Sequence, residues 1–195
     1  MTRICSELGI GDQRMLAGEQ ATVAALRCAL EDAGAALADD GLLVLTFSGH
    51  TVRGEGPIAT ARWCLFDAGI ELSQIAGALA RLPRNARVIV ICDSCYASAI
   101  ASVLSGTQEA IVLASCGEDQ TMVDRMRSEF AVRLEELVIS QRACASLAQL
   151  RELLEHDTPD CERPVVWTNA APRWSRRAPE RARCAHAWWP VDADA

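Results

Sequence analysis

The stretch Arg87–Ser98, with the sequence RVIVICDSCYAS, decides the fold of this chain. Its five consecutive apolar residues, Val88–Cys92, predict a strand that is buried on both faces, as the strands of parallel sheets are. The apolar run ends at Asp93, and a helix of small residues is expected at Ala97–Leu104. Because open α/β sheets bind their ligands at the carboxyl ends of such strands, Cys95 is a candidate for the functional site.

A second buried strand, Leu42–Phe47, leads into the sequence Ser-Gly-His, which ends at His50. An amphipathic helix, Glu71–Leu82, lies between the two strands. Strand, helix and strand in this order predict a right-handed crossover and two parallel strands. If the strands are neighbours, about 4.8 Å apart, both end at the same edge of the sheet, where His50 and Cys95 face one another. Such a pair is sufficient for a thiolate nucleophile with an imidazole acid/base.

The remaining patterns predict an α/β fold in a chain of 195 residues. That length fits one domain with a substantial core, which we assign to residues 1–170. Residues 171–195 are expected to form a tail rich in arginine, tryptophan and proline. Further elements are expected at Gln13–Leu16 (an edge strand), Glu19–Leu37 (a helix), Trp63–Phe66 (a hairpin strand), Ala110–Ser115 (a strand), Ser128–Ser140 and Ser146–His156 (helices) and Pro164–Thr168 (a last strand).

Composition and charge exclude several functional classes. Half of the residues are hydrophobic, which indicates a globular chain, and the net charge of -7 argues against general nucleic-acid binding. No apolar run reaches ~18 residues and no basic segment followed by an apolar one opens the sequence, so we expect a cytoplasmic protein without membrane contact. The nine cysteines are then expected to be reduced thiols rather than a disulfide framework.

The two central motifs resemble those of the caspase and metacaspase family of cysteine proteases, in its small bacterial form. Residues Leu42–His50 match the family's hydrophobic strand followed by Ser-Gly-His, and Arg87–Ser98 match its strand followed by Asp-Ser-Cys-Tyr-Ser/Ala. Less specific matches extend the resemblance over about Met15–Asn169. The resemblance implies a caspase-like three-layer sandwich with a mostly parallel central sheet flanked by helices. The family's first core strand is missing from this sequence, which leaves a gap or an open edge for a partner.

Amide hydrolysis is the activity that this resemblance implies. Cys95 would attack the scissile carbonyl to form a thioester, while His50 protonates the leaving amine and then activates water. The backbone N–H groups of Cys95 and Thr51 would hold the oxyanion. The family usually has glycine where this chain has Thr51. We expect no cofactor and no metal, because Glu55 is the only carboxylate among residues 51–66 and calcium needs several oxygen ligands.

Asp93 occupies the position at which metacaspases have a carboxylate in the primary specificity pocket. A carboxylate there favours arginine before the scissile bond, since a guanidinium pairs with it bidentately. The Gln-Ala-Cys signature of aspartate-cleaving caspases is absent. The alternative interpretation of Asp93 is a carboxylate that caps a helix or braces a loop. Ser94 and Tyr96 are interpreted as structural neighbours.

Arginine-rich segments are candidate processing sites. Arg125 and Arg127 lie where related proteases have an exposed processing loop, and Arg176 and Arg177 offer a second place for cleavage. This enzyme or an activating protease would cut there; the alternative is a solvated loop and a tail that packs on the body or on a partner. The expected partners are protein or peptide substrates. Relatives of the family act in bacterial stress, cell-death or anti-phage signalling, and the sequence leaves open whether the chain is a zymogen.

Two other classes of function are compatible with the motifs. The spacing of Cys92 and Cys95 is that of a C-x-x-C redox or zinc site, which predicts a thiol redox protein. The other alternative is a catalytically inactive caspase-like adaptor that binds partners through an open sheet edge. Neither alternative requires a histidine at the end of the neighbouring strand.

Overall fold

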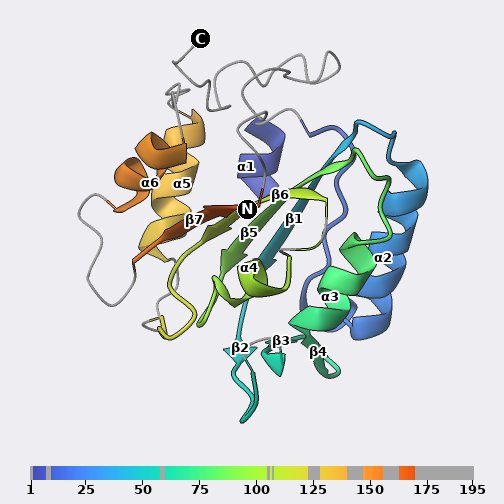
Figure 1. Ribbon diagram of the computed structural model, residues 1–195, viewed down its shortest axis with the longest axis horizontal. Coiled ribbons are helices and arrows are strands. Elements are labelled where there is room, and N and C mark those ends of the chain that lie inside the picture. Colours follow the sequence, from blue (N-terminus) through green and yellow to red (C-terminus); the bar gives the residue numbers. More distant parts are fainter. Residues whose placement is uncertain are drawn as a thin grey trace.

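A central four-stranded sheet organises the computed structural model (Figure 1), which describes residues 2–7, 10–57, 60–104, 106, 108–122, 128–139, 147–155 and 163–169. The strands are, in spatial order, β1 (Leu42–Ser48), β5 (Arg87–Asp93), β6 (Glu109–Ala114) and β7 (Val165–Thr168). The pairs β1–β5 and β5–β6 are parallel, whereas β7 runs antiparallel to β6. The sheet is therefore mostly parallel, as the sequence predicts.

Helices cover both faces of this sheet, and Figure 1 shows α2 and α3 on one side of it and α5 and α6 on the other. Alternate residues of β5 point to the two sides: Val88, Val90 and Cys92 belong to one hydrophobic cluster, and Ile91 belongs to the other. This alternation explains the unbroken apolar run, since both faces of β5 are buried. The helices are α1 (Thr2–Glu7), the 3-10 helix η1 (Gly18–Gln20), α2 (Val23–Ala36), α3 (Leu72–Leu79), α4 (Ala99–Val103), α5 (Glu129–Ile139) and α6 (Leu147–Glu155).

A small antiparallel sheet lies at the carboxyl end of β1 (Figure 1). Its strands are β2 (Thr51–Val52), β3 (Arg62–Cys64) and β4 (Gly69–Glu71). The indole ring of Trp63 is stacked on the ring of Phe47 with the centroids 4.2 Å apart and an interplanar angle of 5°. Trp63 is only 1% exposed and joins the small sheet to the main sheet below the predicted site.

Two expectations about local structure are wrong. Gln13–Leu16 forms no strand, so β1 is the outermost strand on its side of the sheet among the residues that the structure describes. The helix after Cys95 begins at Ala99 rather than Ala97. Residues 95–98 form a turn instead, in which Tyr96 has a φ of 53°, a left-handed conformation. The predicted tail, residues 171–195, lies outside the described residues.

The outer edge of β1 borders a cavity of about 720 Å³. Consecutive residues of the strand, Leu43–Ser48, line one side of this cavity, while α2 and the segment 12–16 line the others. Within the described ranges no strand pairs with this edge. Among the same residues, no helix is long and apolar enough to cross a bilayer.

Candidate active site

The ends of β1 and β5 place His50 and Cys95 at one edge of the sheet. Ser48 and Asp93 form the last pair of the parallel ladder, and the Gly49 N–H donates to the Asp93 carbonyl oxygen at 3.2 Å. His50 and Cys95 are each two residues beyond that last pair. His50 is exposed and Cys95 is half-buried, so both are accessible from solvent. The neighbouring strands that the sequence predicts for the two residues are thus present.

The loops that carry the two residues are in direct contact. Thr51 follows His50 and Ser94 precedes Cys95, and their side-chain oxygens are 2.8 Å apart. Both residues are almost fully buried, with 6% and 2% of their surface exposed. A buried hydroxyl pair of this kind holds the two loops at a fixed separation, because breaking it leaves a polar group without a partner.

Ser94 makes several hydrogen bonds around the turn that carries Cys95. Its hydroxyl donates to the carbonyl oxygen of Cys95 at 3.1 Å and lies 3.3 Å from the sulfur of Cys92. Its backbone N–H donates to the hydroxyl of Ser115, in the loop that follows β6, at 3.3 Å. Because Ser94 and Ser115 are 21 positions apart, no local sequence pattern predicts the contact between them. The one available signal is a small hydroxyl residue immediately before the proposed nucleophile.

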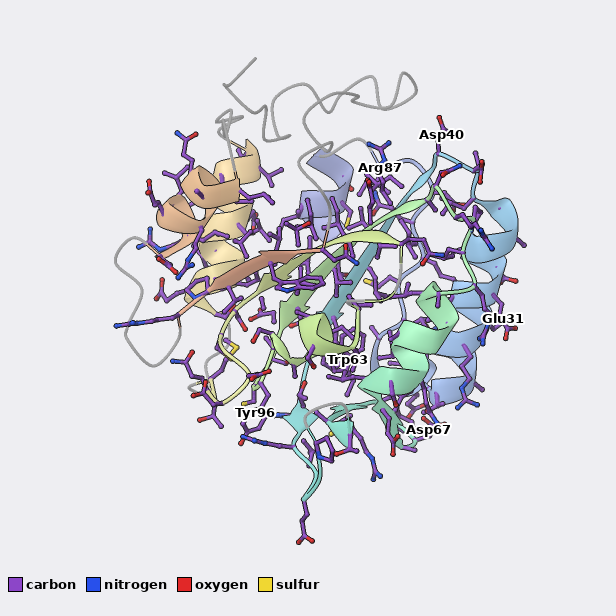
Figure 2. All side chains as sticks on the ribbon, in the orientation of Figure 1. Glu31, Asp40, Trp63, Asp67, Arg87 and Tyr96 are labelled. Carbon is purple, nitrogen blue, oxygen red and sulfur yellow. The ribbon has the colours of Figure 1, made fainter. Side chains whose placement is uncertain are left out.

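The loop after β6 holds the turn around Cys95 from the other side. Tyr96 donates its backbone N–H to the carbonyl oxygen of Gln120 at 2.8 Å, and the N–H of Met122 donates to the Cys95 sulfur at 3.3 Å. Figure 2 shows Tyr96 at the same end of the molecule as the small sheet. A left-handed residue immediately after the cysteine is a strained conformation that such contacts maintain, and strain of this type is concentrated at functional sites.

Two backbone N–H groups at this edge are available to a ligand. In the described part of the chain, the N–H of Cys95 has no hydrogen-bond acceptor. The N–H of Cys64, in β3, donates to the carbonyl oxygen of His50 at 2.8 Å. Because a trans peptide unit directs its C=O and N–H to opposite sides, the N–H of Thr51 points away from β3. The two groups that the resemblance assigns to the oxyanion are therefore outside the β2–β3 ladder.

Cys92 is part of the hydrophobic core and is fully buried. Burial raises the pKa of its thiol to about 12, although the hydrogen bond between this thiol and Ser94 acts in the opposite direction. Burial also raises the pKa of the Cys116 thiol. Cys92 therefore stays protonated at neutral pH, and a protonated thiol is a poor nucleophile. This environment does not suit the exchange chemistry of a C-x-x-C redox pair.

We expect the folded protein to react with iodoacetamide at Cys95 and not at Cys92, because a buried thiol with so high a pKa has little thiolate. Peptide mapping by mass spectrometry after labelling at pH 8 measures this difference, and labelling in guanidinium chloride serves as the control in which both thiols react. Rapid formation of a Cys92–Cys95 disulfide under mild oxidation would instead favour the redox alternative.

Asp93 lies at the end of β5 and contacts the beginning of α5. Its Oδ2 atom accepts a hydrogen bond from the hydroxyl of Ser128 at 2.8 Å, and this hydroxyl also accepts one from the N–H of Ala131 at 3.0 Å. Ser128 thus caps α5, and Asp93 holds the capping residue in place. This contact supports the loop-bracing interpretation of Asp93. The predicted processing sites Arg125, Arg127, Arg176 and Arg177 lie outside the described residues.

No metal centre is formed by the residues that the structure describes: nowhere among them do three or more His, Cys, Asp or Glu side chains gather in a metal-binding arrangement.

Comparisons with known proteins bear on the fold. A scan against protein-family models finds no match, and neither does a search of the curated proteins. Among solved structures, the chain is similar to the crystal structure of protein GSU0716 from Geobacter sulfurreducens, a structural genomics target. The two are 19% identical, the similarity covers 82% of this chain and 77% of that chain, and the TM-score is 0.66. The likeness supports an α/β architecture with a mostly parallel sheet flanked by helices.

Proposed function

We propose that the protein is a cysteine hydrolase with Cys95 as its nucleophile and His50 as its general acid and base. More specifically, we propose a caspase- and metacaspase-like endopeptidase that cleaves after arginine. The observation that carries the proposal is the parallel ladder that ends at Ser48 and Asp93, because it brings the histidine loop and the cysteine loop to one edge of the sheet. A sulfur and an imidazole on neighbouring loops are the minimum that acyl transfer requires.

The chemistry follows from these groups. His50 takes the proton of the Cys95 thiol, the sulfur attacks the scissile carbonyl carbon, and the carbonyl oxygen becomes an oxyanion that the N–H groups of Cys95 and Thr51 stabilise. His50 gives a proton to the departing amine, which leaves a thioester on Cys95. His50 then takes a proton from water, and the resulting hydroxide attacks the thioester carbonyl carbon. The C–S bond breaks, the acid product leaves, and His50 returns the proton to the Cys95 sulfur. His50 is exposed, so water and a peptide both have access to it.

The preference for arginine rests on Asp93. Its backbone lies two residues before the nucleophile at the same sheet edge, and its Oδ2 atom is held by Ser128. A carboxylate at this position in the specificity pocket pairs with a guanidinium, which favours arginine before the scissile bond. Protein or peptide substrates that present arginine are therefore the proposed partners, and the processing sites in the arginine-rich segments belong to the same proposal.

A panel of fluorogenic peptides that differ only in the residue before the scissile bond tests the proposal. We expect cleavage after arginine to exceed cleavage after aspartate or glutamine by about 10²-fold or more, the size of effect that a lost charge pair produces. The protein should be assayed as prepared and also after brief trypsin treatment followed by trypsin inhibition, so that a zymogen is activated. Equal rates before and after blocking of the thiols with iodoacetamide in both preparations would refute the protease proposal.

A second candidate, a catalytically inactive adaptor, is favoured by one observation, the cavity along the unpaired edge of β1. An edge strand with free backbone groups can accept an extended segment from a partner. The peptide panel separates the two candidates, because an adaptor would show no turnover in any of the preparations.

A further inference from the structure

We propose that the hydroxyl pair of Thr51 and Ser94 is a positioning device, which fixes the spacing of the two backbone N–H groups that receive the oxyanion. The inference rests on the proposed hydrolase function and assigns roles to two residues that do not themselves contact the reacting atoms. It explains how a threonine can stand in the position where the related proteases usually have glycine.

The side chain of Thr51 can transmit a constraint to its own backbone. Threonine is branched at Cβ and has a stiff χ1 angle, so an anchored hydroxyl also anchors the backbone of the residue. The Thr51 hydroxyl is anchored by the 2.8 Å contact with Ser94 in a buried environment. The neighbouring residue on the chain, His50, is held on its other side by the N–H of Cys64. The peptide unit between His50 and Thr51 is thus fixed at both ends.

The constraint continues from Ser94 to the nucleophile. A serine hydroxyl has one hydrogen to donate and two lone pairs to accept with. Ser94 gives its hydrogen to the carbonyl oxygen of Cys95 at 3.1 Å. Its oxygen then accepts from the Thr51 hydroxyl and from the Cys92 thiol, which burial keeps protonated. With the Ser94 hydrogen on the carbonyl oxygen of Cys95, the Thr51 hydroxyl is the donor in its contact with Ser94, and the three residues form one continuous chain of contacts.

The geometry connects this network to the oxyanion. The N–H of Thr51 is directed away from β3, and the N–H of Cys95 has no acceptor among the described residues. Two such donors bind an oxyanion well only if their separation is correct, and a small displacement costs much of the rate. The hydroxyl pair lies between the backbones that carry these two donors. Loss of the pair should therefore weaken binding of the tetrahedral state more than binding of the peptide.

The variants Thr51→Val and Thr51→Ser form the test. Valine keeps the branched shape and suits a strand but lacks the hydroxyl, whereas serine keeps the hydroxyl. With an arginine peptide as substrate, we expect Thr51→Val to lower kcat by about 10- to 100-fold with KM changed by less than about 3-fold, a fraction of the loss caused by removal of an oxyanion donor. Thr51→Ser should restore kcat to within about 3-fold of the wild type.

Two reagents separate positioning from loss of structure. A peptide argininal reports on the oxyanion site: the Cys95 S–H adds across the aldehyde C=O, a C–S bond forms, and the former carbonyl oxygen takes the proton while it occupies the oxyanion position. Iodoacetamide reports on the thiol alone, since a C–S bond forms, iodide leaves and no oxyanion develops. We expect Thr51→Val to bind the argininal about 10- to 100-fold more weakly, with the rate of Cys95 alkylation unchanged within about 2-fold.

The outcomes are distinguishable. If the wild type cleaves the peptide and Thr51→Val matches it in kcat and argininal affinity, the positioning role is refuted and the protease proposal stands. If Thr51→Val loses argininal binding and alkylation together, the residue is structural and the positioning role is again refuted. If the wild type neither cleaves the peptide nor binds the argininal, both the hydrolase function and the inference built on it are refuted.

Discussion

Replacement of Cys95 by alanine is expected to lower kcat/KM for an arginine peptide by about 10⁵-fold, because loss of the nucleophile removes nearly all of the acceleration that a catalytic dyad provides. The fold should be retained: the thiol is half-buried, and its removal costs mainly the hydrogen bond from the N–H of Met122, about 1 kcal/mol. The measurement is steady-state cleavage of the peptide together with urea unfolding of the same preparation.

Cys28→Ala is the matched control, since Cys28 is an exposed thiol on α2, and the substitution should leave kcat/KM within about 2-fold. The companion substitution His50→Ala should reduce the rate by about 10²- to 10⁴-fold, the usual contribution of a general acid and base. Cleavage that survives in Cys95→Ala at the wild-type rate would assign the activity to another group or to a contaminant.

Replacement of Trp63 by alanine is expected to lower the free energy of unfolding by about 3–5 kcal/mol, since the indole is fully buried and its removal leaves a large cavity next to Phe47. Urea unfolding followed by far-UV circular dichroism measures the change.

Trp63→Phe is the matched variant, because a smaller ring preserves the stack on Phe47 and should recover more than half of the lost stability. Val52→Ala in the neighbouring strand β2 is the surface control: Val52 is 54% exposed, and its truncation should change the free energy of unfolding by less than about 0.5 kcal/mol. A Trp63→Ala protein as stable as the wild type would mean that the small sheet contributes little to the fold.

Much of the fold could be predicted because its signals are local. The sequence contains clear patterns for the strands β1 and β5 and for the helix between them. Because a strand, a helix and a strand in this order prefer a right-handed crossover with parallel strands, His50 and Cys95 are expected at one edge of the sheet. The ends of the elements differ from the expected ones by a few residues, since hydrogen bonding at termini depends on the surroundings.

What escaped prediction depends on contacts between distant segments. The link from Asp93 to Ser128 spans 35 positions, and the bond between Thr51 and Ser94 spans 43. The left-handed conformation of Tyr96 is not a preference of tyrosine, and it follows from the hydrogen bond to Gln120 in another loop. At such positions the conformation that a residue prefers by itself differs from the one that the fold imposes. Here these positions surround the candidate site.

The central position of β5 has a consequence for how the molecule opens. Its residues belong alternately to the two hydrophobic clusters, Val90 and Cys92 to one and Ile91 to the other, and it pairs with β1 and β6 on its two sides. Neither cluster can be exposed without disturbing this strand, so its amides should be the slowest in the chain to exchange with deuterium. Cys95 lies two residues beyond the last pair of this strand, so we expect the start of its turn to be attached to the most slowly exchanging backbone among the described residues.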